Sequence, residues 1–382
     1  MKESGRPFFS VVVPVFRAEA TLRRAAESIR EQSEPSWEAV LVDDGSPDGS
    51  AKIARSLASE DPRFRVLSHP ENRGTHEARR TGVAAARGEW ILFLDPDDRL
   101  APGLLERLRR RIAADPADIL RFDFRYEDSQ PVDPDQVRFH DARRCSGRSA
   151  HGPGCVLPMF FSGRNESMQL WSFAYRAAVC QEAFARTESA RLVYAEDVYE
   201  LFAIASLAES YGEESFPGYV YDAGAGGITG WRAERDRNPE AYAAGYFANL
   251  ESRLASFAAI ARYAASFRGS AKQAVRRAMR RERRRVLVGT IPWEFSVLSA
   301  AGVPRREALR RAGSAFAPLA RRDRALLRAM LTVRPAMERL RLLPAAPCTR
   351  SAGGSAPRHG SKNRERFSDF RIDRSASPAA RG

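Results

Sequence analysis

The chain has 382 residues, 43% of them hydrophobic, which is enough for one large α/β core and an additional helical region. Its four cysteines show no CxxC or Cys/His spacing, which argues against a disulfide framework or a structural zinc site. The formal net charge of +14 is unevenly divided: residues 262–382 hold 29 Lys and Arg against 8 Asp and Glu, whereas residues 1–261 hold 33 against 40. This division predicts chemistry in the front half and attachment to an anionic partner in the rear half.

The amino-terminal residues lead directly into a buried-strand pattern at residues 8–13 and show no signal-peptide pattern, so we expect a cytoplasmic protein. The longest apolar stretch, residues 286–303, is interrupted by Pro292 and Glu294. This interruption argues against a helix that spans a membrane.

Short apolar runs alternate with amphipathic stretches through residue 126, a pattern typical of consecutive βα units and a largely parallel sheet flanked by helices. The predicted strands cover residues 9–16, 38–42, 63–68, 90–94 and 119–126, and the predicted helices cover residues 18–32, 50–59, 75–86 and 102–114. Pro102 is expected in the first turn of the last of these helices, where proline is tolerated.

From residue 129 to 167 the pattern gives way to Pro, Gly, Asp and Arg, which predicts a long loop with one short helix. The next predicted elements are a strand at residues 169–175, helices at 177–184 and 196–209, and a strand at 219–222. After residue 231 the chain is rich in Ala and Arg and is predicted to be helical to about residue 343. We therefore divide the chain into an α/β domain (1–230), a basic helical region (231–343) and a disordered tail (344–382).

A buried strand is predicted to end in two carboxylates and a glycine turn at residues 40–46, Val-Leu-Val-Asp-Asp-Gly-Ser. Ligands of open α/β sheets bind just beyond the carboxyl ends of strands, so Asp43 and Asp44 are expected where a nucleotide would be recognised. A carboxylate there can accept hydrogen bonds from a base N–H or a ribose hydroxyl. The alternative is that a strand-terminal Asp simply caps the next helix.

A second strand, residues 90–94, runs into Asp95, Asp97 and Asp98. Such clustering is unfavourable unless a cation or protonation offsets the repulsion between the carboxylates. Hard oxygen ligands of this kind suit Mg²⁺ or Mn²⁺ that also contacts substrate phosphates. Two carboxylate clusters at one edge of the sheet therefore predict a site for a nucleotide and a metal ion.

These motifs, in this order and spacing, resemble family 2 glycosyltransferases, which have the GT-A fold, a Rossmann-like and mostly parallel sheet flanked by helices. The resemblance rests on Val12-Val13-Pro14-Val15-Phe16 with Ala18-Glu19, Val42-Asp43-Asp44-Gly45-Ser46-Pro47-Asp48-Gly49-Ser50, Asn72-Arg73-Gly74, Ala78-Arg79, Gly82, Gly88 and Phe93-Leu94-Asp95-Pro96-Asp97-Asp98. It is specific over residues 8–100, and it reaches about residue 230 through Trp171, Glu196-Asp197 and Gly227-Ile228-Thr229.

The resemblance implies an enzyme that moves a sugar from a nucleotide-diphosphate sugar, expected to be a UDP-sugar, to a hydroxyl group of a glycan or lipid-linked acceptor with inversion. Such a reaction belongs to cell-surface polysaccharide or glycolipid synthesis. By the same resemblance, the Asp43–Asp44 pair contacts the nucleoside, and Asp95 and Asp97 form the DxD motif that holds the ribose and the diphosphate-bound metal. The other donor-site residues that it implies are Pro14, Phe16, Glu19, Gly45 and Arg79.

The resemblance also assigns the catalytic base to Asp197, next to Glu196. A base is required because an acceptor hydroxyl is a poor nucleophile until its proton is removed. The alternative for this acidic pair is stabilisation of a helix amino terminus. His76 replaces a small residue of the family, and we interpret it as a solvated loop histidine rather than a catalytic one.

Two other functions fit parts of the sequence. A nucleotidyltransferase would need a glycine-rich, basic loop after the first strand to bind a triphosphate, and residues 14–18 do not supply one. A catalytically weak GT-A-like module could bind an anionic membrane or nucleic acid through its basic rear half. That function predicts a broken site, yet the expected carboxylates are all present, namely Asp43, Asp95, Asp97 and Asp197.

The rear half also suggests peripheral attachment to the cytoplasmic face of a membrane, near a lipid-linked acceptor. Arginines at residues 276–285 lead into the apolar residues 286–303, which contain Trp293 and Phe295 and are followed by arginines at 305–311. An apolar segment that carries aromatic residues and is flanked by arginines suits the headgroup boundary of an anionic bilayer. The alternatives are that this segment packs on the catalytic domain while the arginines face solvent, or that the arginines bind nucleic acid.

Overall fold

The computed structural model describes residues 6–127, 144–161, 169–222, 238–268, 271–300 and 303–339. Its strands are β1 (Phe9–Val15), β2 (Trp37–Asp43), β3 (Phe64–Ser68), β4 (Trp90–Phe93), β5 (Arg99–Leu100), β6 (Ile119–Tyr126), β7 (Ser149–His151), β8 (Phe173–Arg176) and β9 (Ser210–Tyr221). In the described part of the chain these strands form one nine-stranded sheet with the order β3-β2-β1-β4-β8-β6-β9-β5, and β7 pairs with β9.

The amino-terminal part of the sheet is parallel and contains a change of winding direction. β1 lies between β2 and β4 and runs parallel to both. The chain builds β2 and β3 on one side of β1 and then returns to build β4 on the other. The carboxyl ends of β1, β2 and β4 therefore meet at a topological switch point, which is where open α/β sheets bind ligands. β8 is antiparallel to both β4 and β6, so the sheet as a whole is mixed.

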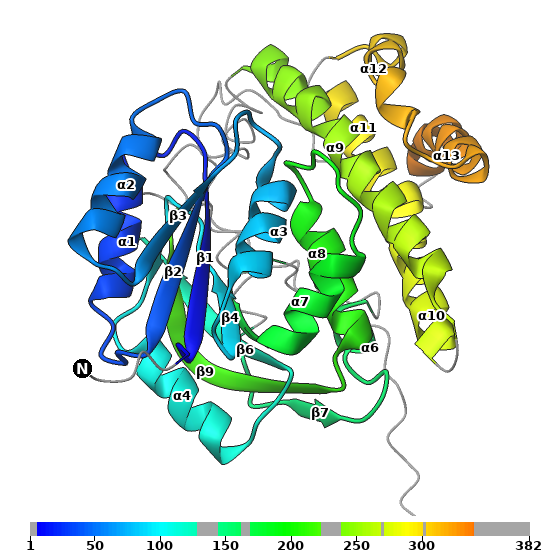
Figure 1. The fold of residues 1–382 in the computed structure, drawn as a ribbon. Coiled ribbons are helices and arrows are strands. Elements are labelled where there is room, and N and C mark those ends of the chain that lie inside the picture. The colour runs from blue at the N-terminus through cyan, green and yellow to red at the C-terminus, as the bar shows by residue number, and fades with distance from the viewer. Residues whose placement is uncertain are drawn as a thin grey trace, which may run out of the picture. The chain divides into compact units, whose positions relative to one another are not determined.

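Helices cover both faces of this sheet (Figure 1). The helices of the α/β domain are α1 (Leu22–Arg30), α2 (Ser50–Glu60), α3 (Thr75–Ala85), α4 (Leu104–Ala114), α6 (Leu157–Phe160), α7 (Ala177–Arg186) and α8 (Glu196–Leu207). Side chains alternate along a strand, so Val11 and Val13 of β1 pack with α1, α2 and α4, while Val12 packs with α3, α7 and α8. Every residue of β1 is buried, which explains its continuous apolar sequence.

The rear of the described chain is helical, as expected. It comprises α9 (Pro239–Ser266), α10 (Ala271–Arg283), the π-helical turn η2 (Arg284–Thr290), α11 (Ile291–Ala300), α12 (Arg305–Arg311), the 3-10 turn η3 (Ser314–Phe316) and α13 (Arg321–Arg339). The long helix α9 packs on both sides. Ile260 and Tyr263 belong to the core that contains α7 and α8, whereas Leu250 and Leu254 belong to a separate core with α11 and α13.

Five described residues of the apolar segment 286–303 are buried in that second core, namely Val286, Leu287, Ile291, Phe295 and Leu298. Phe295 is 5% exposed, and its ring centroid lies 6.0 Å from that of Tyr246 in α9. The expectation that this segment lies at the headgroup boundary of a bilayer does not hold for Phe295, because the ring already packs inside the protein. The side chain of Trp293 lies outside the described residues. Among the described helices, none is both long and apolar enough to cross a membrane.

The predicted strands and helices of residues 9–126 are all present, with small shifts at their ends. One detail is wrong: α4 begins at Leu104, and Pro102 lies before it in a turn where Gly103 has a φ of 76°. β9 begins at Ser210, well before the predicted residue 219. The domain boundaries at residues 230 and 343 and the disordered tail stay predictions, because they fall outside the described residues.

Candidate active site

The loop that follows β1 is held against the loop that follows β2. Glu19 Oε2 accepts a hydrogen bond of 2.9 Å from the Gly49 N–H, and Asp48 Oδ2 accepts one of 3.2 Å from the Glu19 N–H. Pro14 is buried within β1, whereas Phe16, just beyond the strand, is 38% exposed. Glu19 therefore braces the two loops, and Phe16 presents apolar surface at the switch point.

Two residues other than glycine have a positive φ within the described ranges. These are Arg17, at 52°, and Ala195, at 60°. The left-handed conformation costs a non-glycine residue roughly 1–2 kcal/mol and persists only where the surroundings impose it. Arg17 follows Phe16 directly and Ala195 precedes Glu196 directly, so the strained backbone lies beside a residue expected to bind the donor and beside the acidic pair expected to contain the base.

Asp43 ends β2 with one carboxylate oxygen available. Its Oδ1 accepts a hydrogen bond of 3.1 Å from the Ser46 N–H, and its Oδ2 has no hydrogen-bond partner among the described residues. Gly45 has a φ of 67°, and a Cβ there would lie 2.6 Å from the carbonyl carbon of Glu71. The turn therefore requires glycine. The free oxygen of Asp43 can accept a hydrogen bond from a nucleoside at this edge.

Asp44 has a different role from the one we expected. Its Oδ1 accepts a hydrogen bond of 2.9 Å from the Arg73 N–H and lies 2.6 Å from His69 Nδ1, while its Oδ2 accepts one of 2.8 Å from the Gly74 N–H. Both oxygens are thus used within the protein, and the residue is 2% exposed. We correct the expectation of a nucleoside contact: Asp44 holds the loop that leads into α3.

Asp95 and Asp97 follow β4 at the same edge of the sheet. The Asp95 side chain is 26% exposed, and its Oδ1 accepts a hydrogen bond of 3.1 Å from Arg79. Burial, together with the nearby Asp95 carboxylate, raises the pKa of Asp97 to about 6. A raised carboxyl pKa means that the negative charge is unfavourable at that position, so a bound cation would be stabilised there.

This charge distribution fits a divalent cation. Mg²⁺ commonly binds through one or two carboxylates, several waters and the phosphates of a substrate. In the part of the chain that the structure describes, no group of three His, Cys, Asp or Glu side chains is placed to hold a metal ion unaided. Asp95 and Asp97 therefore suit a Mg²⁺ or Mn²⁺ ion that is shared with a diphosphate, rather than an all-protein metal site.

The third carboxyl group of this motif points inward. Asp98 is 1% exposed and accepts hydrogen bonds of 2.7 Å from the Tyr219 hydroxyl and 2.8 Å from the Asp222 N–H. The Tyr219 oxygen in turn accepts one of 3.1 Å from the Asp95 N–H, and the indole of Trp171 stacks on Tyr219 at 4.3 Å. Burial raises the pKa of Asp98. Asp98 thus fixes the turn that carries Asp95, a role for which the sequence motif gave no indication.

The acidic pair expected to contain the base lies in the first turn of α8. Burial raises the pKa of Asp197 to about 6 and that of Glu196 to about 8, although the nearby Arg79 lowers both. The two groups titrate as a pair. Burial therefore favours the neutral form more strongly for Glu196 than for Asp197. Because a general base must be deprotonated, Asp197 is the better candidate of the two.

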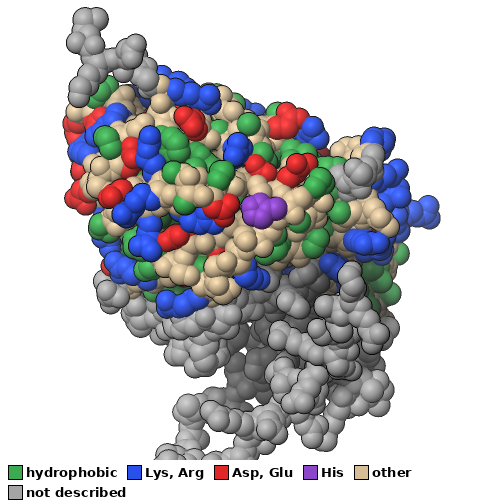
Figure 2. Space-filling view, turned by 90° about the horizontal axis from the view of Figure 1, so that it is seen from below, with side chains coloured by type: hydrophobic (Ala, Val, Ile, Leu, Met, Phe, Trp, Pro, Cys, Tyr) green, Lys and Arg blue, Asp and Glu red, His purple; other side chains and the backbone are tan. Residues whose placement is uncertain are grey.

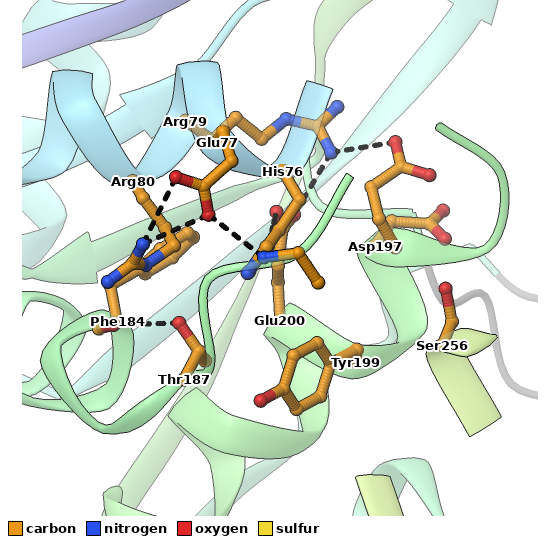
Figure 3. Close-up of polar contacts among 12 residues, drawn as sticks. His76, Glu77, Arg79, Arg80, Phe184, Thr187, Asp197, Tyr199, Glu200 and Ser256 are labelled. Carbon is orange, nitrogen blue, oxygen red and sulfur yellow. Dashed lines mark hydrogen bonds and ion pairs between the residues drawn. The ribbon is translucent and has the colours of Figure 1, made fainter. Parts of the chain in front are cut away.

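Arg79 links the metal motif to α8. Its Nη2 donates to Asp95, and its Nη1 donates to Glu196 Oε1 at 3.2 Å. Nη1 also donates to Glu200 Oε2 at 3.0 Å (Figure 3). Burial opposes its charge, but the surrounding carboxylates outweigh burial and raise the pKa of Arg79 above its ordinary value. The residue is 3% exposed. We expected a donor ligand, and the structure instead places Arg79 behind the site as an internal connection.

The expectation that His76 is a solvated loop histidine is wrong. The residue is 0% exposed in the first turn of α3, with Nδ1 2.8 Å from Glu200 Oε1 and Nε2 3.2 Å from the Glu188 carbonyl oxygen. The sequence contains a pattern that is consistent with this buried position. His76 and Arg79 are three residues apart and Glu196 and Glu200 are four apart, the spacings at which side chains share one face of a helix.

The geometry agrees with comparisons to known proteins. Residues 10–172 match the family model described as glycosyl transferase family 2. The putative glycosyltransferase EpsH of Bacillus subtilis is 40% identical over 114 residues, which are 30% of this chain and 33% of EpsH. The succinoglycan biosynthesis protein ExoO of Rhizobium meliloti is 29% identical over 234 residues, which are 58% and 63% of the two chains. The matches therefore span about a third of EpsH and less than two thirds of ExoO.

Solved structures show the same fold. Residues 1–349 of TarS from S. aureus, in complex with UDP-GlcNAc, superpose with a TM-score of 0.55 at 19% identity, over 86% of this chain and 91% of that one. A second structure of S. aureus TarS gives a TM-score of 0.54, over 86% of this chain and 52% of that one. The GT-A fold expected from the sequence is confirmed. Residues 227–229, which the sequence resemblance included, lie outside the described residues.

Proposed function

We propose that this chain, whose residues 10–172 match the family model of glycosyl transferase family 2, transfers a sugar from a nucleotide-diphosphate sugar to a hydroxyl group of an acceptor. The observation that carries the proposal is the meeting of carboxylates from distant parts of the chain at one sheet edge. Asp43 ends β2 and Asp95 follows β4, and Arg79 connects Asp95 to the first turn of α8. That turn carries Asp197, the proposed base.

Each side chain then has a chemical role. Asp43 accepts a hydrogen bond from the nucleoside, and Asp95 and Asp97 hold the divalent cation. When bound, that cation offsets the negative charge that develops on the nucleoside diphosphate as it leaves. Asp197 accepts the proton of the acceptor hydroxyl. If attack occurs on the face opposite the leaving group, the anomeric configuration inverts, and this is the outcome that we propose.

The relatives guide the choice of substrates. TarS was solved with UDP-GlcNAc, so UDP-sugars are the first donors to test. ExoO is named for succinoglycan biosynthesis, which supports a glycan or lipid-linked acceptor and a place in cell-surface polysaccharide or glycolipid synthesis. The alternative, a catalytically weak GT-A-like module that binds an anionic surface, lacks support from the site, where the proposed base and metal ligands are all present.

Release of UDP tests this function. We expect the purified protein with Mn²⁺ to hydrolyse at least one UDP-sugar slowly and to show a higher melting temperature with that donor, since a ligand bound to the native state alone stabilises it. EDTA should stop the hydrolysis, and added Mn²⁺ or Mg²⁺ should restore it. If no nucleotide sugar gives either hydrolysis or a thermal shift, the module alternative replaces the enzyme.

We also propose that the protein attaches to the cytoplasmic face of an anionic membrane through α10 rather than through the apolar segment that follows. α10 buries Val275, Ala278 and Glu282. The exposed arginines at its other positions and at the start of η2 have no ion-pair partner among the described residues; they are Arg276, Arg277, Arg280, Arg281 and Arg284. Figure 2 shows Lys and Arg side chains gathered at the right edge, on the side where Figure 1 places α10, α12 and α13. Unpaired arginines on one helix face suit an anionic bilayer surface.

Liposome flotation tests this attachment. Changing Arg277, Arg280 and Arg284 to Gln should weaken binding to anionic liposomes on the order of 10²-fold, from about 1 kcal/mol per arginine. The control changes three ion-paired arginines of the α/β domain to Gln, namely Arg107, Arg110 and Arg186, and removes the same charge. Equal flotation of both triple variants, or no binding of the wild type at moderate salt, would remove α10 from this role. Binding to duplex DNA instead of liposomes would favour a nucleic-acid partner.

A further inference from the structure

The interface between α3 and α8 contains a group of buried charges that the proposed reaction does not by itself explain. His76 and Arg79 of α3 face Glu200 of α8 (Figure 3), and Arg79 also contacts Glu196. The side chains of His76 and Glu200 are both 0% exposed. Groups of this kind are stable inside a protein only when their charges and hydrogen bonds are matched.

The partners of His76 determine where its protons are. The Glu188 carbonyl oxygen can only accept a hydrogen bond, so Nε2 of His76 donates to it. Glu200 also accepts from Arg79, which favours its ionised form, so Nδ1 of His76 donates to Glu200 as well. The ring packs at 5.4 Å from the Tyr199 ring. The geometry therefore calls for an imidazolium, with a proton on each nitrogen.

The positive charge of His76 affects which carboxyl groups Arg79 contacts. Arg79 contacts carboxyl groups of Asp95, Glu196 and Glu200. In a poorly solvated interior an unbalanced carboxylate attracts a nearby guanidinium strongly. Without the charge of His76, Glu200 would compete for Arg79 at the expense of Asp95 and Glu196. With it, Arg79 remains shared between the metal motif and the first turn of α8.

The first turn of α3 also holds the segment that enters α8. The His76 N–H donates to the Leu192 carbonyl oxygen at 3.2 Å, and Glu77 Oε1 accepts from the Ala190 N–H at 3.2 Å. Together with the bond from the ring to Glu188, these contacts restrain the loop that ends at the strained residue Ala195. The next two residues of the chain are the acidic pair.

We propose that His76 is a positioning residue for the transfer reaction. By donating from both ring nitrogens it balances Glu200 and restrains the loop before α8, which keeps Arg79 on Asp95 and holds Asp197 at a fixed distance from the metal motif. This inference rests on the proposed glycosyl transfer. Small displacements of a catalytic group are costly: a misplacement of about 1 Å can reduce the rate on the order of 10²-fold.

A double-mutant cycle on turnover tests the proposal, with variants His76→Phe, Glu200→Gln and both together. We expect His76→Phe to lower kcat on the order of 10²-fold with the donor KM changed less than about threefold. Glu200→Gln added to it should restore at least about tenfold, because the neutral amide no longer competes for Arg79. A packing role for the ring predicts no such recovery. Tyr211→Phe is the matched control, since it removes a buried hydrogen bond to Glu213 in β9.

Two outcomes of the cycle would overturn the proposal: wild-type kcat in folded His76→Phe, or a double variant no more active than the single one. If His76→Phe does not fold, His76→Gln replaces it, because an amide can still donate to Glu200 but carries no charge. Wild-type kcat in His76→Gln, or a double variant no more active than His76→Gln alone, would then overturn the proposal.

A measurement that needs no activity separates this inference from the proposed function. Nitrogen-15 NMR of the histidine rings at pH 7, with His76 assigned from its variant, should show both ring nitrogens protonated. One unprotonated nitrogen would place the proton on Glu200 and overturn the proposal, whatever the enzyme does. Two protonated nitrogens in a protein that hydrolyses no nucleotide sugar would instead support the charge arrangement and contradict the transferase.

Discussion

Changing Asp97 to Asn is expected to reduce sugar transfer on the order of 10³-fold and to leave the fold intact. Metal ions stabilise transition-state charge by several kcal/mol, which corresponds to a factor of that size. Burial and the neighbouring Asp95 raise the pKa of Asp97 to about 6, so its charge is already unfavourable in the free protein. Removing that charge at neutral pH should therefore not lower the melting temperature. Transfer assays with Mn²⁺ and thermal unfolding without ligand measure the two effects.

The control for this variant is Asp115→Asn. Asp115 lies at the end of α4, pairs with Arg111 and has a side chain that is 47% exposed. Its loss should leave transfer unchanged. Full activity of Asp97→Asn, or of the wild type in excess EDTA, would show that Asp97 and the metal have no part in the reaction. A large fall in melting temperature would show that Asp97 supports the fold instead.

The βα units are predictable from sequence because local periodicity determines them. The run at Val11–Val13 is apolar throughout since both faces of a central parallel strand are buried. The positions of Asp43 and Asp95 at one edge follow from the same pattern, because parallel strands present their carboxyl ends together. The first half of β9 is not predictable from an apolar pattern, because it contains buried polar residues. One of them is Glu213, which forms ion pairs with Arg121 and Arg148.

Side-chain direction is less predictable, since it depends on partners far away in the chain. Asp44 turns toward the loop at residues 69–74, and Arg79 and His76 turn toward α8, whose Glu200 is more than a hundred residues further on. A family motif indicates which residue types a site contains, but it does not state which of them face the ligand. In this site Asp44, Arg79 and His76 point into the protein and support the side chains that face the ligand.

The packing of the rear helices is hard to predict for the same reason, because it depends on partners far away in the chain. An apolar segment flanked by arginines fits both a bilayer surface and a helical core, and only the packing of α9 against α11 distinguishes them. Arg253 of α9 illustrates the difference, because it pairs with Glu294 at 2.5 Å within this core. The sequence thus indicates the charge of this region correctly, and the exposed arginines of α10 display part of it.

Changing Asp197 to Asn is expected to lower kcat by roughly 10²- to 10⁴-fold, the contribution of general-base catalysis, with donor affinity little changed. Donor titration by thermal shift and single-turnover kinetics separate these effects. A collapse of donor affinity would place Asp197 in the donor site instead. A carboxyl-to-amide change on the exposed surface, Glu182→Gln in α7, serves as the control.

The pH dependence of the same pair gives a second measurement of the base. The pKa of Asp197 lies at about 6, so wild-type kcat should fall as the pH drops below about 6 and protonates this carboxylate. Stability should fall as the pH rises, whereas kcat should rise. Folding raises the pKa values of Asp197 and Glu196, to about 6 and about 8, so the folded state binds these protons more tightly than the unfolded state. The stability that these protons contribute at low pH is therefore lost as the pH rises through these values. At pH 8 Asp197→Asn should therefore be at least as stable as the wild type, while its remaining activity should lack the step near pH 6. If the variant keeps that step, another group is the base, and Glu196→Gln is the next variant to measure.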